Sequence, residues 1–184
     1  MIRVLVALVL AALVAPSAWA DKFDSAAWFD AARDGDVAAL TTLAGKRPAA
    51  VIETVDDSGY SALILAAYHD EDAAVAWLVA HGASTCATDK RGYTALMGAV
   101  FRGHERIIDR LAAKPCGADY VTASGQTPLM LAALFGRTEV VTKLLAAGAD
   151  PKRADGNGYT ARSLATAQGN TAIVTLLDRA LAKK

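Results

Sequence analysis

The feature that most constrains this chain is a glycine that recurs every 33 residues, at Gly59, Gly92, Gly125 and Gly158. A sequence repeat with a period of about 20 to 50 residues is typical of solenoids, in which each unit buries its apolar face against the next. The chain is therefore expected to be a stack of units rather than a domain around one central core. The predicted units are 24–58, 59–91, 92–124, 125–157 and 158–184.

Each unit carries the signals of two helices. Two residues after each period glycine stands a serine or threonine whose hydroxyl can cap a helix start. These residues are Ser61, Thr94, Thr127 and Thr160. Eleven residues after the period glycine a second glycine can end that helix, and Gly35 takes this position in the first unit.

A second helix is predicted to follow in each unit. Over 138–147, for example, apolar residues recur with helical spacing at Val140, Val141, Leu144 and Leu145. Because both predicted elements of the repeat are helices, the predicted fold class is all-α.

These residues resemble the ankyrin repeat, and the resemblance extends over 24–184. Close matches are Thr127-Pro128-Leu129 and the segment from Leu144 to Asp150. The resemblance implies a solenoid of about five helix-turn-helix repeats joined by β-hairpin-like turns. It also implies a protein that binds partner proteins on a concave face formed by the turn tips and the first helices.

The sequence departs from the family pattern at three places. The usual histidine after the leucine is replaced by Ile64, Met97, Met130 and Ser163. In the unit 92–124, Lys114-Pro115-Cys116 precedes the Gly-Ala-Asp segment, so the exit of its second helix is predicted to shift by two residues. The turn of this unit has Thr122 where the other units have Asp56, Asp89 and Asp155.

Composition and motifs argue against several functions. Lys plus Arg and Asp plus Glu each number 19, so no excess of positive charge is present to neutralise a nucleic-acid backbone. The sequence contains no H-E-x-x-H zinc motif and no G-x-S-x-G nucleophile motif. The segment 156–161 has the form of a dinucleotide-binding pattern but falls on a repeat turn, and the acidic run 70–72 falls at a predicted helix start. We therefore expect no enzymatic activity, no cofactor, no metal and no nucleic-acid partner.

The first twenty residues have the pattern of a secretory signal peptide. Arg3 is followed by twelve apolar residues from Val4 to Ala15, and Ala18-Trp19-Ala20 provides a small-x-small cleavage pattern. As a helix this run is shorter than a hydrocarbon core of about 30 Å. An uncleaved membrane anchor is the alternative. We expect a soluble mature protein, free of the membrane, in the bacterial periplasm or secreted.

Cys86 and Cys116 are the two cysteines of the chain, and both fall near the turn edge of adjacent units. In an exported protein, an isolated pair of cysteines suggests a disulfide. Two separated thiols are the alternative, because a disulfide requires Cα atoms within about 7 Å of each other.

The aromatic residues indicate a binding surface. Six of the eleven aromatics after Ala20 fall in the few repeat positions that the resemblance places on the concave face. Tyr, Phe and Arg are typical anchors of protein interfaces; the alternative is that several of them are packing spacers between units. Trp28 is assigned to the core. The predicted protein-binding residues are Tyr60, Tyr68, His69, Tyr93, Phe101, Arg102, Gln126, Phe135 and Tyr159, and Leu134 and Gln168 occupy equivalent positions.

The predicted function is non-catalytic binding of a partner protein by a monomer in the periplasm, as an inhibitor or immunity factor of an envelope or secreted enzyme. Two alternatives are a structural scaffold for envelope proteins and an accessory factor in oxidative-stress defence. The last is implied by the resemblance to exported ankyrin proteins.

We predict that the mature protein begins at Asp21, because signal peptidase cleaves after a small-x-small pattern that follows a short apolar run. Intact-mass measurement of the protein recovered from a periplasmic fraction checks this. A full-length product that stays with the membrane would contradict the prediction.

Overall fold

The computed structural model describes residues 23–46 and 48–182. The predicted signal peptide and its cleavage site lie outside these residues. The described part of the chain forms eleven α-helices and no strand. In chain order they are α1 (Ser25–Arg33), α2 (Val37–Ala44), α3 (Pro48–Val51), α4 (Ala62–Tyr68), α5 (Asp72–Ala80), α6 (Ala95–Arg102), α7 (Glu105–Leu111), α8 (Pro128–Leu134), α9 (Thr138–Ala146), α10 (Ala161–Ala167) and α11 (Thr171–Ala182).

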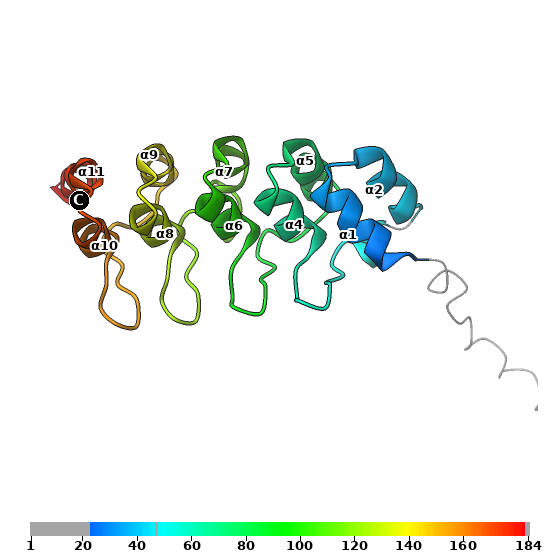
Figure 1. Cartoon of the computed structure of the whole chain (residues 1–184), viewed down its shortest axis with the longest axis horizontal. Coiled ribbons are helices and arrows are strands. Elements are labelled where there is room, and N and C mark those ends of the chain that lie inside the picture. Colours follow the sequence, from blue (N-terminus) through cyan, green and yellow to red (C-terminus); the bar gives the residue numbers. More distant parts are fainter. Residues whose placement is uncertain (1–22, 47, 183–184) are drawn as a thin grey trace, which may run out of the picture.

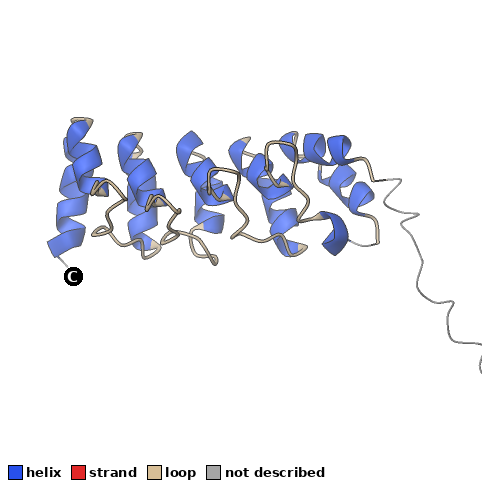
Figure 2. Cartoon of the chain, turned by 90° about the horizontal axis from the view of Figure 1, so that it is seen from below, coloured by secondary structure: helices blue, strands red, loops and turns tan. Residues whose placement is uncertain are grey.

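Five antiparallel helix pairs stand in a row (Figure 1). The first helices α1, α4, α6, α8 and α10 form one layer, and the second helices α2, α5, α7, α9 and α11 form the other. The turns between units project from the layer of first helices, and viewed from below they lie in front of the row (Figure 2). The all-α solenoid expected from the repeat is confirmed.

The first connection contains an element that the repeat pattern does not predict. The longer loop of the unit 24–58 folds into the single turn of α3, which begins at Pro48. Val51 and Ile52 are buried there, at 3% exposure each. The extra residues of this unit therefore cover the end of the core.

Small side chains fill the seam between first helices. Ala66, Ala67, Ala99, Ala132 and Ala133 are each fully buried. Alanine allows neighbouring helices to approach closely without leaving voids, which is how protein interiors reach their packing density. Larger side chains, such as those of Leu78 and Leu144, fill the space between the two layers. Trp28 is also fully buried, so its assignment to the core is confirmed.

Each of the four predicted capping residues starts a first helix. Their hydroxyl oxygens accept hydrogen bonds from backbone N–H groups three residues further on, at 3.3 Å for Ser61, 3.4 Å for Thr94, 3.2 Å for Thr127 and 3.1 Å for Thr160. At α10 the bond is reciprocal, because Ser163 Oγ accepts a hydrogen bond from the backbone N–H of Thr160 at 2.9 Å. One of the residues that replaces the family histidine therefore provides a capping interaction of its own.

One or two residues after each first helix, the chain has a residue with a left-handed backbone. Gly103 ends α6 with φ of 84°, and Gly35, Gly136 and Gly169 also have positive φ. In the unit 59–91 the same position holds Asp70, with φ of 69°. Aspartate is among the non-glycine residues that tolerate this conformation. Two residues of the acidic run 70–72 therefore have structural roles. Asp70 adopts the left-handed backbone, and Asp72 lies in the first turn of α5, where its negative charge interacts favourably with the helix dipole.

The turns between units share one hydrogen-bonding pattern. Oδ1 of Asp56, Asp89 and Asp155 accepts hydrogen bonds from the backbone N–H groups two and four residues later, all at 2.9 Å. In the remaining turn Thr122 Oγ1 accepts a hydrogen bond from Gln126 N at 3.0 Å. Thr122 therefore preserves one of the two bonds, and the turn keeps the shape that places Gln126 over the first helices.

We predict that Leu144→Ala lowers the free energy of unfolding by about 2 to 5 kcal/mol, because Leu144 is fully buried and its truncation leaves a cavity. Urea unfolding followed by circular dichroism measures this. Leu145→Ala is the matched control, since the adjacent leucine of α9 is only half-buried and should cost less. Equal losses for the two variants would show that α9 does not pack through the face described here.

Candidate functional site

The turns and first helices of the three units from 59 to 157 enclose a groove of about 450 Å³. The turns contribute polar and aromatic side chains: Tyr60, Asp89, Arg91, Tyr93 and Gln126. The helices and the residues at their ends contribute Leu65, Tyr68, His69, Met97, Gly98, Phe101, Leu131, Leu134 and Phe135. One wall of the groove is therefore polar, and its floor and other wall are apolar.

Seven of the nine residues that the sequence predicts for partner binding line this groove: Tyr60, Tyr68, His69, Tyr93, Phe101, Gln126 and Phe135. The other two lie outside it. Arg102 flanks the groove, with its guanidinium carbon 5.1 Å from the centroid of the Tyr68 ring. Tyr159 belongs to the next turn and is 53% exposed. The groove is thus shorter than the predicted surface, and ends before the unit 158–184.

Three exposed aromatic rings run along the apolar wall. The rings of Tyr68 and Phe101 are nearly parallel, with centroids 6.2 Å apart and an interplanar angle of 13°. Phe101 meets Phe135 edge to face at 4.9 Å. The exposed fractions are 37% for Tyr68, 42% for Phe101 and 41% for Phe135. These values exclude the alternative that the three rings are buried spacers between units.

Residues of the following unit hold the backbone of this aromatic row in place. The carbonyl oxygen of Tyr68 accepts a hydrogen bond from Nε2 of His104 at 3.0 Å, and Nδ1 of His104 lies 3.5 Å from Asp70 Oδ1. The carbonyl oxygen of Phe101 accepts a hydrogen bond from Nη2 of Arg137 at 3.4 Å. His104 therefore has a structural role, because it positions the backbone of a residue of the groove.

The tyrosines of the turns have a different role from the exposed rings. The sequence places Tyr93 facing outward, but the structure shows its ring half-buried and packed against the core, as is that of Tyr60. The reason is that the ring packs between the core and the next turn, which contains Gln126. The Tyr93 hydroxyl donates a hydrogen bond to Gln126 Oε1 at 2.7 Å. Tyr93 therefore connects two units as well as lining the groove.

Asp89 and Arg91 form an ion pair in the polar wall. Asp89 is 7% exposed, and its Oδ2 accepts hydrogen bonds from Nε and Nη2 of Arg91 at 3.3 and 3.2 Å. Desolvation opposes the charge on Arg91, but the hydrogen bonds to Asp89 and its negative charge outweigh this effect and raise the pKa of Arg91 above its usual value. The guanidinium also lies 5.0 Å from the centroid of the Tyr93 ring.

The repeat pattern does not predict the floor of the groove. Gly98 lies there, in α6, between Leu65 of α4 and Leu131 of α8. These leucines lie 33 residues before and after Gly98, so the sequence has a glycine where the period predicts a leucine. The ion pair between Asp89 and Arg91 was not predicted either, because the repeat pattern identifies Asp89 only as a turn residue.

Comparison with protein families gives one match. A family model of ankyrin repeats, which spans three copies of the repeat, matches residues 28–124 and again residues 98–182. The chain belongs to the ankyrin-repeat family. Ankyrin repeats are generally protein–protein interaction modules and are typically not catalytic. Comparison with curated proteins finds no match.

Within 23–46 and 48–182, no group of three or more His, Cys, Asp or Glu side chains is arranged to hold a metal ion. Among the helices that the structure describes, none is long and apolar enough to cross a membrane.

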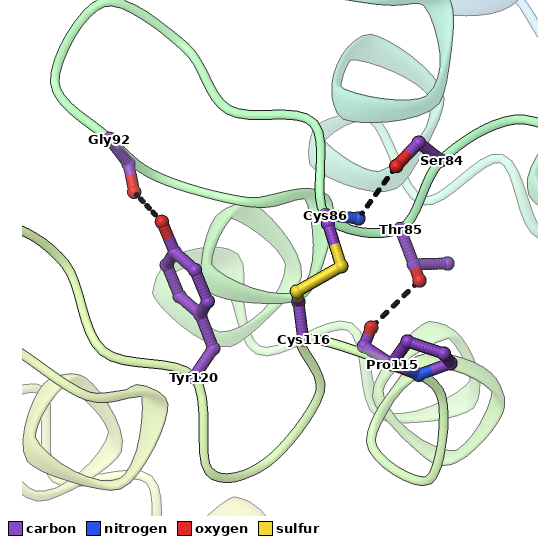
Figure 3. Close-up of a disulfide and its surroundings, with 7 residues drawn as sticks. All are labelled: Ser84, Thr85, Cys86, Gly92, Pro115, Cys116 and Tyr120. Atoms are coloured by element: carbon purple, nitrogen blue, oxygen red, sulfur yellow. Dashed lines mark hydrogen bonds between the residues drawn. A yellow bond between two sulfur atoms is a disulfide. The ribbon is translucent and has the colours of Figure 1, made fainter.

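A disulfide joins two of the units that form the groove. Cys86 follows α5 and Cys116 follows α7, with Cα atoms 5.1 Å apart and a sequence separation of 30 (Figure 3). The contact depends on the early end of α7 at Leu111, after which the chain turns back toward the preceding unit. A hydrogen bond from Thr85 Oγ1 to the carbonyl oxygen of Pro115, at 2.7 Å, joins the same two loops.

We predict that denatured, unreduced protein contains no free thiol, because Cys86 and Cys116 are bonded to each other. The enclosed loop should contribute about 3 to 4 kcal/mol to the free energy of unfolding, since a crosslink restricts the unfolded chain. Thiol labelling followed by mass spectrometry checks the bond, and urea unfolding of a double Cys→Ser variant checks the energy. Two labelled thiols per chain would contradict it.

Proposed function

We propose that this protein is an exported, non-catalytic module that binds a partner protein in the groove. The observation that carries the proposal is the row of Tyr68, Phe101 and Phe135, three neighbouring aromatic side chains that are each more than one third exposed. Large apolar side chains gathered at a solvent-exposed groove mark interaction sites in soluble proteins.

The groove has the composition of a protein interface. Its apolar floor is bordered by hydrogen-bonding groups of Gln126, Tyr93 and the Asp89–Arg91 pair. Aromatic and arginine side chains are enriched among interface hot spots, and aromatic rings in particular bury a large area at a small cost in conformational entropy. The bonds from His104 and Arg137 to the aromatic row reduce that cost further, since the backbone is ordered before the partner arrives.

The proposed location is the periplasm or the medium outside the cell. Two features of the chain support export. The segment 1–20 has the pattern of a signal peptide, and the Cys86–Cys116 bond is of a kind that persists in oxidising compartments.

Within this function we propose an inhibitor or immunity factor of an envelope or secreted enzyme. A single groove that gathers most of the exposed aromatics suits tight binding of one partner, as an inhibitor requires. A scaffold needs a second surface, and a depression of about 490 Å³ between α9 and α11 that includes Leu145, Pro151 and Leu176 is a candidate for it. A role as an accessory factor in oxidative-stress defence would also use the groove and differs only in the partner.

We predict that Phe101→Ala weakens partner binding by about 30- to 1,000-fold, as expected when a central aromatic anchor is truncated. Its melting temperature should stay close to that of the wild type, since the ring is 42% exposed. Partners captured from a periplasmic extract by the mature protein are identified by mass spectrometry, purified, and titrated against each variant. Inhibition is then measured directly if the partner is an enzyme.

Tyr159→Ala is the matched control, because it removes an exposed aromatic ring beyond the groove and should change affinity much less. Unchanged affinity in Phe101→Ala would place the partner on another face. Loss of binding in Leu176→Arg, with Phe101→Ala unaffected, would favour the depression between α9 and α11 and a scaffold.

A further inference from the structure

The sixth position after the period glycine differs in the central unit. It holds Leu65, Leu131 and Leu164 in the other units that share the period, and Gly98 in the unit 92–124. Gly98 lies inside α6 (Ala95–Arg102), more than two residues from either end. Glycine in a helix interior destabilises the helix relative to alanine, so the residue has a folding cost.

Nothing in the local structure requires a glycine at this position. The backbone of Gly98 is not in the left-handed region. A Cβ atom added here would meet only the Tyr68 side chain, at 3.8 and 4.0 Å, which are ordinary van der Waals distances. At Gly125, in contrast, a glycine is required, because a Cβ there would lie 2.8 Å from the backbone of Asp155. The absence of a side chain at Gly98 is therefore explained by the groove that this residue lines, and not by the local backbone.

That space is part of the groove. Gly98 lines the groove together with Leu65 and Leu131 of the neighbouring first helices, and the rings of Tyr68 and Phe101 line it as well. The equivalent position of the other units carries a leucine, so the groove lacks one leucine side chain at Gly98, where the Tyr68 side chain is the nearest neighbour. We call this part of the groove the Gly98 socket.

The accessible charge next to the socket is positive. In the Asp89–Arg91 pair, the Arg91 side chain is 66% exposed, whereas that of Asp89 is 3% exposed and already accepts hydrogen bonds. Arg102 flanks the same groove and lies over the Tyr68 ring. A molecule bound in the groove at Gly98 therefore has the guanidinium group of Arg91 in the groove lining and that of Arg102 over the Tyr68 ring beside it.

Resting on the proposed function, we propose that the Gly98 socket receives one large apolar side chain of the partner, and that an acidic residue beside this anchor pairs with Arg91 or Arg102. The occupant is a segment of another protein, because the socket continues into a groove with hydrogen-bonding groups along one wall. Apolar and charged contacts together would select an anchor of this composition.

The test uses short random peptides displayed on phage and selected on the mature protein. Selected sequences should share a Leu, Ile, Met, Phe or Trp next to Asp or Glu. Synthetic copies should bind the wild type and lose about tenfold or more in affinity when the anchor is replaced by Ala or when the protein carries Gly98→Leu. Gly98→Ala is the matched control, since it improves the helix while filling little of the socket, and it should bind within a few-fold of the wild type. Thermal melting shows that both variants fold.

The outcomes separate this proposal from the proposed function. Peptides that bind Gly98→Leu as tightly as the wild type, but lose affinity with Phe101→Ala, would overturn the socket and leave groove binding in place. Peptides insensitive to both changes would overturn both proposals. Selected peptides without a shared apolar anchor, or with basic neighbours, would overturn the assigned chemistry. Self-association of the wild type in sedimentation, abolished by Gly98→Leu, would identify a second copy of this chain as the occupant instead.

Discussion

The first helices of adjacent units can stand close together only because alanines fill the seam between them. Ala66, Ala99 and Ala132 are fully buried at equivalent positions, and each leaves room for the backbone of its neighbour. This spacing brings the side chains two or three residues later, Tyr68, Phe101 and Phe135, within stacking distance across units. A larger residue in the seam would separate the helices and with them the rings, so the groove is a consequence of how the core packs.

The 33-residue period predicted the fold, whereas the groove depends on positions that depart from the period, such as Gly98. The period glycines, the capping hydroxyls and the apolar positions of α9 could be interpreted from spacing alone, because each has the same physical reason in every unit. Gly98 differs from these positions, because the sequence shows it only as one interruption of the period and its effect is a side chain missing from a helix that still forms. The double role of Tyr93 was missed for a related reason. Its position in the repeat is known from the sequence, but the direction of its ring is set by the following turn, through Gln126.

Ion pairs join the units along their outer surface. Asp72 of α5 pairs with Arg110 of α7, Lys143 of α9 pairs with Asp109, and Arg153 pairs with Asp119. Hydrogen bonds from Arg110 lower the pKa of Asp72 below its usual value. Exposed pairs contribute only about 0 to 1 kcal/mol each. Because each pair spans two units, these contacts favour one register of stacking more than they add to stability.

In a solenoid each unit contacts only its neighbours, so thermal fraying starts at the ends and proceeds unit by unit. The bond between Cys86 and Cys116 interrupts this progression at one seam. The units 59–91 and 92–124 stay tethered even when the helices around them open, and they reassociate as one chain segment rather than by chance encounter. The seam they share is the one crossed by Tyr68 and Phe101. The part of the molecule with the slowest amide hydrogen exchange should thus lie beneath the groove, with protection decreasing toward both termini.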